Sequence, residues 1–309
     1  MSFNPFTADP TVVARLATYS PDRVSAIQSE AQAVAEDGVI SAREAERLVA
    51  VHGLSGVRDL MLLLLDVAKA FAHPPISGFF VGAVGLESPS GDLLLGGNVE
   101  FPGTHLGTTL HGEGFVATRA FNRGADLAAI AIGEAHPCAH CRQYLSEFAS
   151  SKTLELFDPL GHTLTLEQLY PWPFDPAYLG APGAIPTQPG QPTLELENND
   201  GSQTAQLLLA AGRHAHAPYS KCPGAVVVAL KGGRLIGGSG IESVAFNPTM
   251  PPLQAALVDL LAAGRRYDEI EHVTLGTAIG GAVDYTASTR ELLVQIAPRA
   301  GLTTIGWAR

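Results

Sequence analysis

The chain has 309 residues, enough for about two ordinary domains. Hydrophobic residues make up 46% and charged residues 16%, which excludes a disordered, tail-like chain. The formal net charge of -11 disfavours general binding to nucleic-acid phosphates. The apolar run at 60–65 ends at Asp66, far short of the ~20 residues that span a membrane, so no membrane partner is expected.

The cysteine content bears on the cellular compartment. Cys138 and Cys141 form one Cys-x-x-Cys, and Cys222 stands alone. Three cysteines cannot form a complete disulfide framework, and the first ten residues lack the basic and apolar stretches of a secretory signal. We therefore expect a cytoplasmic location.

The first seventy residues predict helices, each with its own start signal. Asp9 and Ser20 each precede a proline, which places a capping residue before the first helical position. Ser41 begins a capping box, and Ser55 precedes a last, leucine-rich helix. Since no chemistry-bearing pattern occurs here, we interpret residues 1–55 as a helical segment for packing or assembly.

From residue 74 onward, strand patterns alternate with helix patterns, which is typical of a layered α/β sheet. We expect strands at 79–86, 93–98, 127–132 and 153–157, and helices at 111–123 and 138–148. The segment 158–200 then contains eight of the 22 prolines, too many for regular helix or central strand. An extended, semi-rigid linker is predicted there.

The last third of the chain repeats the middle third. At an offset of 142 residues, Glu100 aligns with Glu242, and a His-x-Pro-x-Ser stretch opens both copies at 73–77 and 216–220. We interpret this as a duplication, with chance similarity between two glycine-rich hairpins as the alternative. The predicted divisions are a helical segment at 1–55, a catalytic domain at 56–157, a linker at 158–200 and a second domain at 201–309.

One combination of residues points to metal chemistry. His111, Glu113, Cys138 and Cys141 form the pattern His-x-Glu … Pro-Cys-x-x-Cys. One imidazole and two thiolates are a natural ligand set for zinc and leave a fourth position open for water. The two cysteines lie three apart at a predicted helix start, where both sulfurs project to one side and the helix dipole favours thiolates. Glu113 is suited to exchange a proton with the water.

Other interpretations of the same residues remain open at this point. A lone Cys-x-x-Cys is also compatible with a redox pair or with plain packing. A closed structural zinc site is a further alternative, with His136 or His140 as the fourth ligand. The combined pattern, however, is the one that zinc deaminases of nucleobases use.

From about residue 48 to 309, the sequence resembles the two-domain, homodimeric cytidine deaminases of bacterial type. The motifs that carry the resemblance are Asn-Val-Glu-Phe at 98–101, His-Gly-Glu at 111–113, Pro-Cys-Ala-His-Cys-Arg-Gln at 137–143, His-Ala-Pro-Tyr-Ser-Lys at 216–221 and Ala-Phe-Asn-Pro-Thr-Met-Pro-Pro-Leu-Gln at 245–254. The last two motifs are specific to this group. The resemblance implies an α/β fold in which helices precede two deaminase-like α/β/α sheets, the second of them degenerate.

The resemblance also implies roles for single residues. His111, Cys138 and Cys141 would ligate one zinc ion per chain, and Glu113 would be the proton shuttle. The substrate would contact Phe79, Asn98, Glu100, Gly112 and His136 of the same chain, and Phe174, Ala245 and Phe246 of the partner subunit. Ordinary core burial is the alternative for the three phenylalanines.

Two positions depart from the family pattern, and the second repeat departs further. Gly112 stands where alanine is common, and His136 stands where threonine is common. At the same offset, the zinc and shuttle residues align with Leu253, Ala255, Thr286 and Thr289, after a loop-length change before the last two. The second repeat therefore cannot hold this zinc, and we expect it to complete the dimer and cover the neighbour's pocket.

The hypothesis that follows is hydrolytic deamination of cytidine, and of deoxycytidine, to uridine or deoxyuridine plus ammonia in pyrimidine salvage. Zinc-bound hydroxide would attack carbon 4 of the base, with Glu113 carrying the proton. One alternative is a non-catalytic, zinc-stabilised dimeric binding protein. Another is a deaminase for a different nucleobase substrate, although the net charge and the lack of a Lys/Arg cluster near His111 argue against a polynucleotide.

Overall fold

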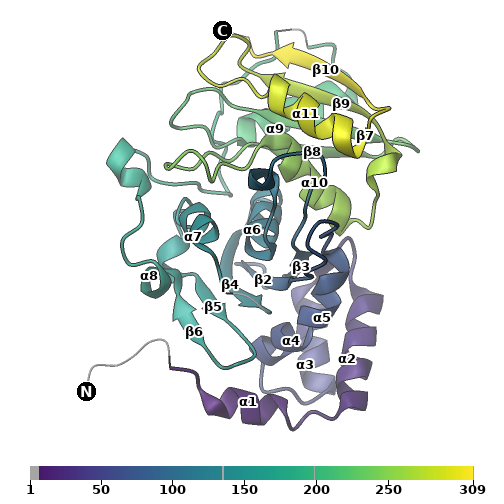
Figure 1. The fold of residues 1–309 in the computed structure, drawn as a ribbon, viewed down its shortest axis with the longest axis vertical. Helices are drawn as coiled ribbons and strands as arrows, with labels where there is room; N and C mark the ends of the chain where they lie inside the picture. The colour runs from purple at the N-terminus through teal and green to yellow at the C-terminus, as the bar shows by residue number, and fades with distance from the viewer. Residues whose placement is uncertain (1–6, 134–135, 198, 309) are drawn as a thin grey trace.

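The protein consists of a helical N-terminal part and two β-sheets. A computed structural model describes residues 7–133, 136–197 and 199–308. The N-terminal helices lie at one end of the molecule, the first sheet lies in the middle, and the second sheet lies at the other end (Figure 1). Within these described ranges, no helix is long and apolar enough to cross a membrane.

The predicted helix starts in the N-terminal part are confirmed. Asp9, Ser20 and Ser41 are the N-caps, and each side chain accepts a hydrogen bond from a backbone N–H of the first turn. The helices are α1 (Pro10–Leu16), α2 (Pro21–Val34) and α3 (Ala42–Val51). The single leucine-rich helix expected after Ser55 is instead divided into α4 (Val57–Leu63), α5 (Leu65–Ala68) and the 3-10 helix η1 (Lys69–Phe71).

The first sheet has the strand order β1-β3-β2-β4-β5-β6. Its strands are β1 (Val39–Ile40), β2 (Gly82–Ser88), β3 (Leu93–Gly97), β4 (Asp126–Ile132), β5 (Glu155–Phe157) and β6 (Thr163–Thr165). Only the β4–β5 pair is parallel, among the pairs of this sheet that the structure describes. The helices that carry the predicted metal motif are α6 (Gly112–Asn122) and α7 (Ala139–Leu145).

The proline-rich segment 158–200 is only partly the extended linker that we predicted. Its beginning forms β6 and α8 (Leu166–Leu169), because β6 pairs with β5 and Thr165 forms a capping box with Gln168. The eight prolines all lie outside these two elements. The remainder is irregular apart from η4 (Pro176–Leu179), and it leads to α9 (Gln203–His214).

The second sheet repeats the first, which supports the duplication. Its order is β10-β9-β7-β8, with β7 (Ala225–Leu230), β8 (Leu235–Ser239), β9 (Ile270–Thr277) and β10 (Gly301–Gly306). As in the first sheet, a hairpin pairs antiparallel with a third strand, which pairs parallel with a fourth. Both copies show a register shift at one place, between Leu86 and Glu87 and between Ala229 and Leu230.

The structure corrects our alignment of the helices in the two repeats. Val99 pairs with Leu110 just before α6, and Ile241 pairs with Met250 just before α10 (Pro252–Ala262), so the second loop is two residues shorter. The residues that replace His111 and Glu113 are therefore Pro251 and Leu253, rather than Leu253 and Ala255. At the start of α11 (Thr286–Ile296), Tyr285 and Ser288 stand at the positions of Cys138 and Cys141, rather than Thr286 and Thr289. The conclusion that the second repeat lacks the metal ligands is unchanged.

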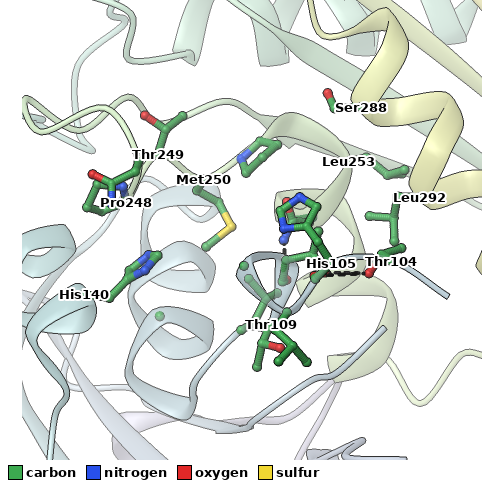
Figure 2. Close-up of a pocket in the computed structure, with 18 of the residues that line it drawn as sticks. Thr104, His105, Thr109, His140, Pro248, Thr249, Met250, Leu253, Ser288 and Leu292 are labelled. Carbon is green, nitrogen blue, oxygen red and sulfur yellow. Dashed lines mark hydrogen bonds between the residues drawn. The ribbon is translucent and has the colours of Figure 1, made fainter. Parts of the chain in front are cut away.

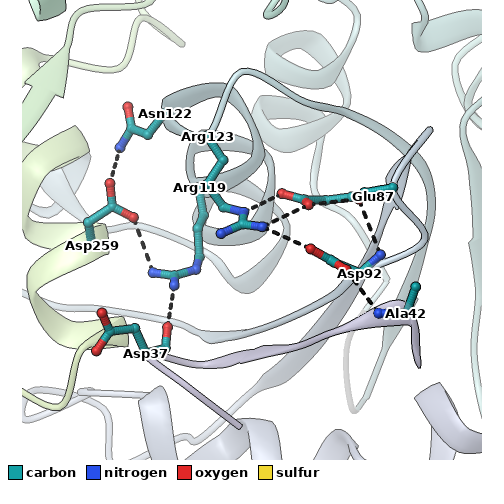
Figure 3. Close-up of polar contacts among 9 residues, drawn as sticks. Asp37, Ala42, Glu87, Asp92, Arg119, Asn122, Arg123 and Asp259 are labelled. Atoms are coloured by element: carbon teal, nitrogen blue, oxygen red, sulfur yellow. Dashed lines mark hydrogen bonds and ion pairs between the residues drawn. The ribbon is translucent and has the colours of Figure 1, made fainter. Parts of the chain in front are cut away.

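Helices α6 and α10 pack against one another between the two sheets (Figure 1). One cluster of buried apolar residues runs through both repeats and includes Phe115 and Leu257. Polar contacts reinforce the packing: Arg119 lies 3.1 Å from Asp259, and Asn122 donates to the same carboxylate at 2.8 Å (Figure 3). These contacts tie the last turns of α6, the helix that begins at the predicted site, to α10 of the second repeat.

Candidate active site

Two helix starts bring the predicted metal ligands together. His111 is the N-cap of α6, Cys138 is the N-cap of α7, and Cys141 lies in the first turn of α7. The Nδ1 atom of His111 is 3.5 Å from the sulfur of Cys138 and 3.4 Å from that of Cys141, and the two sulfurs are 3.7 Å apart. The sequence pattern had placed both sulfurs on one side of a helix start, and the structure shows them there.

These separations fit one zinc ion. Zn–S bonds of about 2.3 Å and Zn–N bonds of about 2.05 Å in a tetrahedral site imply S···S and N···S distances of about 3.8 Å and 3.6 Å. Within the described part of the chain, this donor group contains no fourth side chain, so neither His136 nor His140 closes the site. A three-donor set of this kind leaves one coordination position for water, as catalytic zinc sites do.

The electrostatics of the donor group favour a bound cation. Hydrogen bonds from Cys141 and from His111 lower the pKa of the Cys138 thiol to about 3. The hydrogen bond to Cys138 raises the pKa of His111, and the same partner, together with burial, raises the pKa of Cys141. A metal ion bound by these three atoms would displace the protons that they carry, so its binding depends on pH.

Glu113 lies in the first turn of α6 and is buried, with 4% of its surface exposed. Burial raises the pKa of its carboxyl group, and this effect outweighs the hydrogen bonds and the charge of His111 that lower it. A buried carboxyl beside a metal donor group, with its pKa raised, is suited to accept and return a proton.

Asn98 and Glu100, which the resemblance assigns to the ribose, hold the chain segment that leads into β2. The amide of Asn98 donates to the carbonyl of Phe79 and accepts from the N–H of Val81, at 2.8 and 2.9 Å. The carboxylate of Glu100 accepts from both the N–H and the hydroxyl of Ser77. These bonds explain why the strand that we expected at 79–86 begins only at Gly82. The second hydrogen on the Asn98 nitrogen and free lone pairs on Glu100 remain for a ligand.

The three phenylalanines expected near the substrate are not core residues. Phe79, Phe174 and Phe246 are 53%, 40% and 65% exposed. Ala245 is half-buried and directly precedes Phe246. The structure therefore excludes ordinary core burial for these rings in the single chain.

The side chain of His136 lies beside Asp158 rather than in the donor group. Its Nδ1 is 3.6 Å from the carboxylate, and its ring packs edge-on against His162. His136, Asp158 and His162 could in principle hold a metal ion. A hydrogen bond of 2.7 Å between His162 and Asp158, and two backbone N–H groups that donate to the same carboxylate, account for this cluster without one.

A cavity of about 310 Å³ lies between the two repeats, next to the donor group (Figure 2). His111, His140 and Cys141 line it from the first repeat, and Met250 and Leu253 line it from the second. Gln254 donates across it to the carbonyl of Thr108 at 2.7 Å. Glu113, Asn98 and Glu100 do not belong to its lining, so the cavity and the predicted nucleoside site share only the wall that His111 and Cys141 form.

The sequence analysis missed two buried polar residues near the end of α7, Gln143 and Glu147. In the sequence, Gln143 is visible only as part of the motif at 137–143, and no motif includes Glu147. Both contact the segments that carry the exposed phenylalanines. The available signal was a charged residue on a helix whose other residues predicted core packing.

Comparisons with known proteins agree with this geometry. Two family profiles, both described as "Cytidine and deoxycytidylate deaminase zinc-binding region", match residues 55–155 and 166–290. A cytidine deaminase of Vibrio cholerae serotype O1 is 33% identical over 264 residues, which cover 85% of this chain and 87% of the relative. "Cytidine deaminase 6" of Arabidopsis thaliana is 36% identical over 272 residues, 81% of this chain and 92% of the relative.

A crystal structure of cytidine deaminase from Mycobacterium leprae overlaps 35% of this chain and 89% of its own chain, with 23% sequence identity and a TM-score of 0.29. The family assignment depends on the full-length relatives and on the zinc-binding profiles. The chain belongs to the cytidine deaminase family, and it is a zinc-dependent deaminase.

Proposed function

We propose that the protein catalyses the hydrolytic deamination of cytidine, and also of deoxycytidine, to the corresponding uracil nucleoside and ammonia. The observation that carries the proposal is the donor triangle of His111, Cys138 and Cys141 with the buried carboxylate of Glu113 beside it. The relatives that cover most of the chain are named cytidine deaminases. Cytidine, the substrate in the names of these relatives, is a substrate that this donor group and carboxylate can deaminate.

The proposed roles divide between the metal and the side chains. Zinc, when it is held by His111 and the two cysteines, supplies a Lewis acid that activates water. Glu113 takes one proton of the nucleophilic water and delivers it to nitrogen 3 of the ring. It then takes the second proton from the same oxygen and gives it to the departing amino group, so that ammonia leaves and the oxygen becomes the carbonyl of carbon 4. Because burial raises the pKa of its carboxyl group, the carboxylate is a stronger base than an exposed one, which suits it to accept this proton.

The remaining residues are proposed to bind and orient the nucleoside. Asn98 and Glu100 would contact the ribose hydroxyls with the hydrogen-bonding capacity that their bonds to Phe79 and Ser77 leave free. Gly112 offers its backbone N–H at the first position of α6, where helix N–H groups lack partners within the helix. His136, whose side chain faces Asp158, would contribute through its backbone.

We further propose that the protein acts as a cytoplasmic homodimer in pyrimidine salvage. Phe174, Ala245 and Phe246 would cover the base in the partner's site, since the two rings are exposed in the single chain. The three cysteines are unpaired, as in a reducing compartment. We retain the proposed divisions 1–55, 56–157, 158–200 and 201–309, with the second repeat in a structural role.

The decisive experiment replaces Glu113 with Gln and measures both the metal and the reaction. We expect the zinc content to stay at one ion per chain, because Glu113 is not a donor. We expect uridine formation to fall by about 10²–10⁴-fold, the usual contribution of a positioned acid–base group. Glu87, another buried carboxylate but one that pairs with Arg123, provides the matched control as Glu87→Gln. Normal turnover by Glu113→Gln would show that the assigned role is wrong.

A substrate comparison tests the rest of the proposal. Cytidine, deoxycytidine and a single-stranded oligonucleotide are offered at low salt. Turnover of both nucleosides without oligonucleotide turnover is the expected outcome. Turnover of the oligonucleotide would overturn the expectation from the net charge of -11.

A further inference from the structure

Helix α7 and the residues just after it carry buried polar side chains in addition to the metal donors. Its beginning supplies Cys138 and Cys141, as described above. Near its end lie Gln143 and, two residues past its last helical residue, Glu147. Both are polar and buried, with exposed fractions of 6% and 0%. Buried polar groups are expensive unless their hydrogen bonds are made, so their partners show what these residues do.

Gln143 holds the backbone of Phe174. Its side-chain nitrogen donates to the carbonyl of Phe174 at 2.8 Å, and its side-chain oxygen accepts from the N–H of the same residue at 3.1 Å. The hydroxyl of Tyr170 donates to that oxygen as well. An amide that pairs with both backbone groups of one residue fixes where that residue's ring can point.

Glu147 holds the segment that ends in Phe246. One carboxylate oxygen accepts from His216 at 2.7 Å and from the hydroxyl of Tyr219 at 2.6 Å. The other accepts from the backbone N–H of Val244 at 2.8 Å, two residues before Phe246. His216, Tyr219 and Val244 all belong to the second repeat, so Glu147 ties the end of α7 to that repeat.

The two segments present aromatic rings to the outside. Phe246 has a φ of +64°, a backbone conformation that is unfavourable for a bulky residue, and its ring is 65% exposed. Phe174 is 40% exposed, and Phe79 is 53% exposed. Exposed aromatic residues held in a strained or fixed backbone indicate a contact surface for another molecule. A second copy of this chain, with its own exposed Phe79, offers matching apolar surface.

We infer that Gln143 and Glu147 are positioning residues for the active site of the partner subunit. They fix the two segments whose rings cover the partner's substrate, while the same helix holds the metal of its own subunit. The inference rests on the proposed function and on the proposed dimer. It predicts that changes at these residues act in trans: the damaged site lies in the subunit that is not mutated.

Hybrid dimers with a single working site test this directly. In the trans arm, one subunit carries Glu113→Gln together with Glu147→Gln, and its partner is unchanged. In the cis arm, one subunit carries Glu113→Gln alone, and the partner that keeps Glu113 carries Glu147→Gln. Both hybrids contain the same substitutions in total, so a general loss of stability affects them equally. Affinity tags of two kinds separate hybrids from parent dimers.

We expect KM for cytidine to rise about ten-fold in the trans arm, because the loss of one buried hydrogen-bond pair shifts an equilibrium by roughly that factor. In the cis arm, KM should stay within about two-fold of the hybrid that carries Glu113→Gln only. Equal KM values in the two arms, or a defect confined to the cis arm, would overturn the inference. Full cytidine turnover by a monomeric form of the unmutated protein would also overturn the inference.

Two further variants guard against misfolding. If Glu147→Gln does not fold, Gln143→Met replaces it in both arms, since methionine keeps the length of the side chain but cannot pair with Phe174. Glu87→Gln is the control, because Glu87 is also buried but pairs with Arg123 rather than with either segment. It should give no difference between the arms. If unmutated dimers do not deaminate cytidine at all, the proposed function fails instead, and the two failures are distinguishable.

Discussion

Gly112 allows the sharpest test of how tightly the start of α6 is packed. It stands directly between His111 and Glu113. A Cβ atom at this position would lie 2.9 Å from the Cβ of Ala83 in β2. Optimal carbon–carbon contacts are about 3.5–4.0 Å, so Gly112→Ala must push α6 away from β2 or bend the strand.

The expected change in the free energy of unfolding of Gly112→Ala is the difference between two effects. Alanine in place of glycine stabilises a helix by up to about 1 kcal/mol, and by less at its first position. Overpacking of a filled core costs typically about 1–3 kcal/mol. We therefore expect Gly112→Ala to lower the free energy of unfolding by about 1 kcal/mol. Because the displaced residues include His111 and Glu113, we also expect a several-fold loss of kcat/KM.

The same helix supplies the control. At Gly114, an added Cβ would meet no atom within 4 Å, so Gly114→Ala should stabilise the protein by about 0.5–1 kcal/mol. Urea unfolding and cytidine turnover are measured for both variants. Ala83→Gly should relieve the clash, so the two sites should couple by about 1 kcal/mol in a double-mutant cycle. If Gly112→Ala proves as stable as Gly114→Ala, and Ala83→Gly does not change its effect, this account of the packing is wrong.

Three further predictions concern charge and metal. The pKa of Asp59 lies below its ordinary value, because hydrogen bonds from Arg15 and Tyr19 outweigh the raising effect of burial. Asp59→Asn should therefore lower the free energy of unfolding by about 1–3 kcal/mol at pH 7, measured by urea unfolding. The difference from wild type should shrink below about pH 4, where the carboxyl of the unfolded chain becomes protonated. Cys138→Ser should lower both zinc content and uridine formation, and added zinc should not restore full activity. Asp259→Ala should cost about 2–4 kcal/mol, because it leaves the buried guanidinium of Arg119 without its carboxylate (Figure 3).

Each of these has a result that contradicts it. For Asp59→Asn, it is a stability difference that is constant from pH 7 to pH 3. For Cys138→Ser, it is full zinc content measured after dialysis against a chelator. For Asp259→Ala, it is an unchanged free energy of unfolding. A double variant that combines Asp259→Ala with Arg119→Met and is nearly as stable as wild type would support the same reasoning.

The sequence predicted those features that depend on local chemistry. Caps at Asp9, Ser20 and Ser41 and the metal pattern around Cys138 are short-range signals, and the structure shows each of them where it was expected. The helix predicted at 138–148 is shorter, Ala139–Leu145, and the chain after it pairs with Ala184 instead. The partners of Glu147, His216 and Tyr219, also lie far away in the sequence, and no local pattern predicts such partners.

The offset between the repeats shows a second limit of sequence reasoning. A constant offset of 142 aligned the glycines, but Ala83 pairs with Gly96 whereas Val226 pairs with Gly238, an offset of 143 in one strand and 142 in the next. Register is fixed by the pairing partner and the loop between them. A single spacing could therefore reveal the duplication but could not assign the replacements of His111 and Glu113.

The shared apolar cluster between α6 and α10 has a consequence for the history of this architecture. A free-standing first repeat would expose the part of the shared apolar cluster that is now covered where α6 packs on α10. Such an exposed apolar patch favours association, so a single ancestral unit would pair with a second copy of itself. Fusion of two such units would make that pairing a permanent contact within one chain, and one repeat would then be free to lose its metal ligands while it keeps the packing surface.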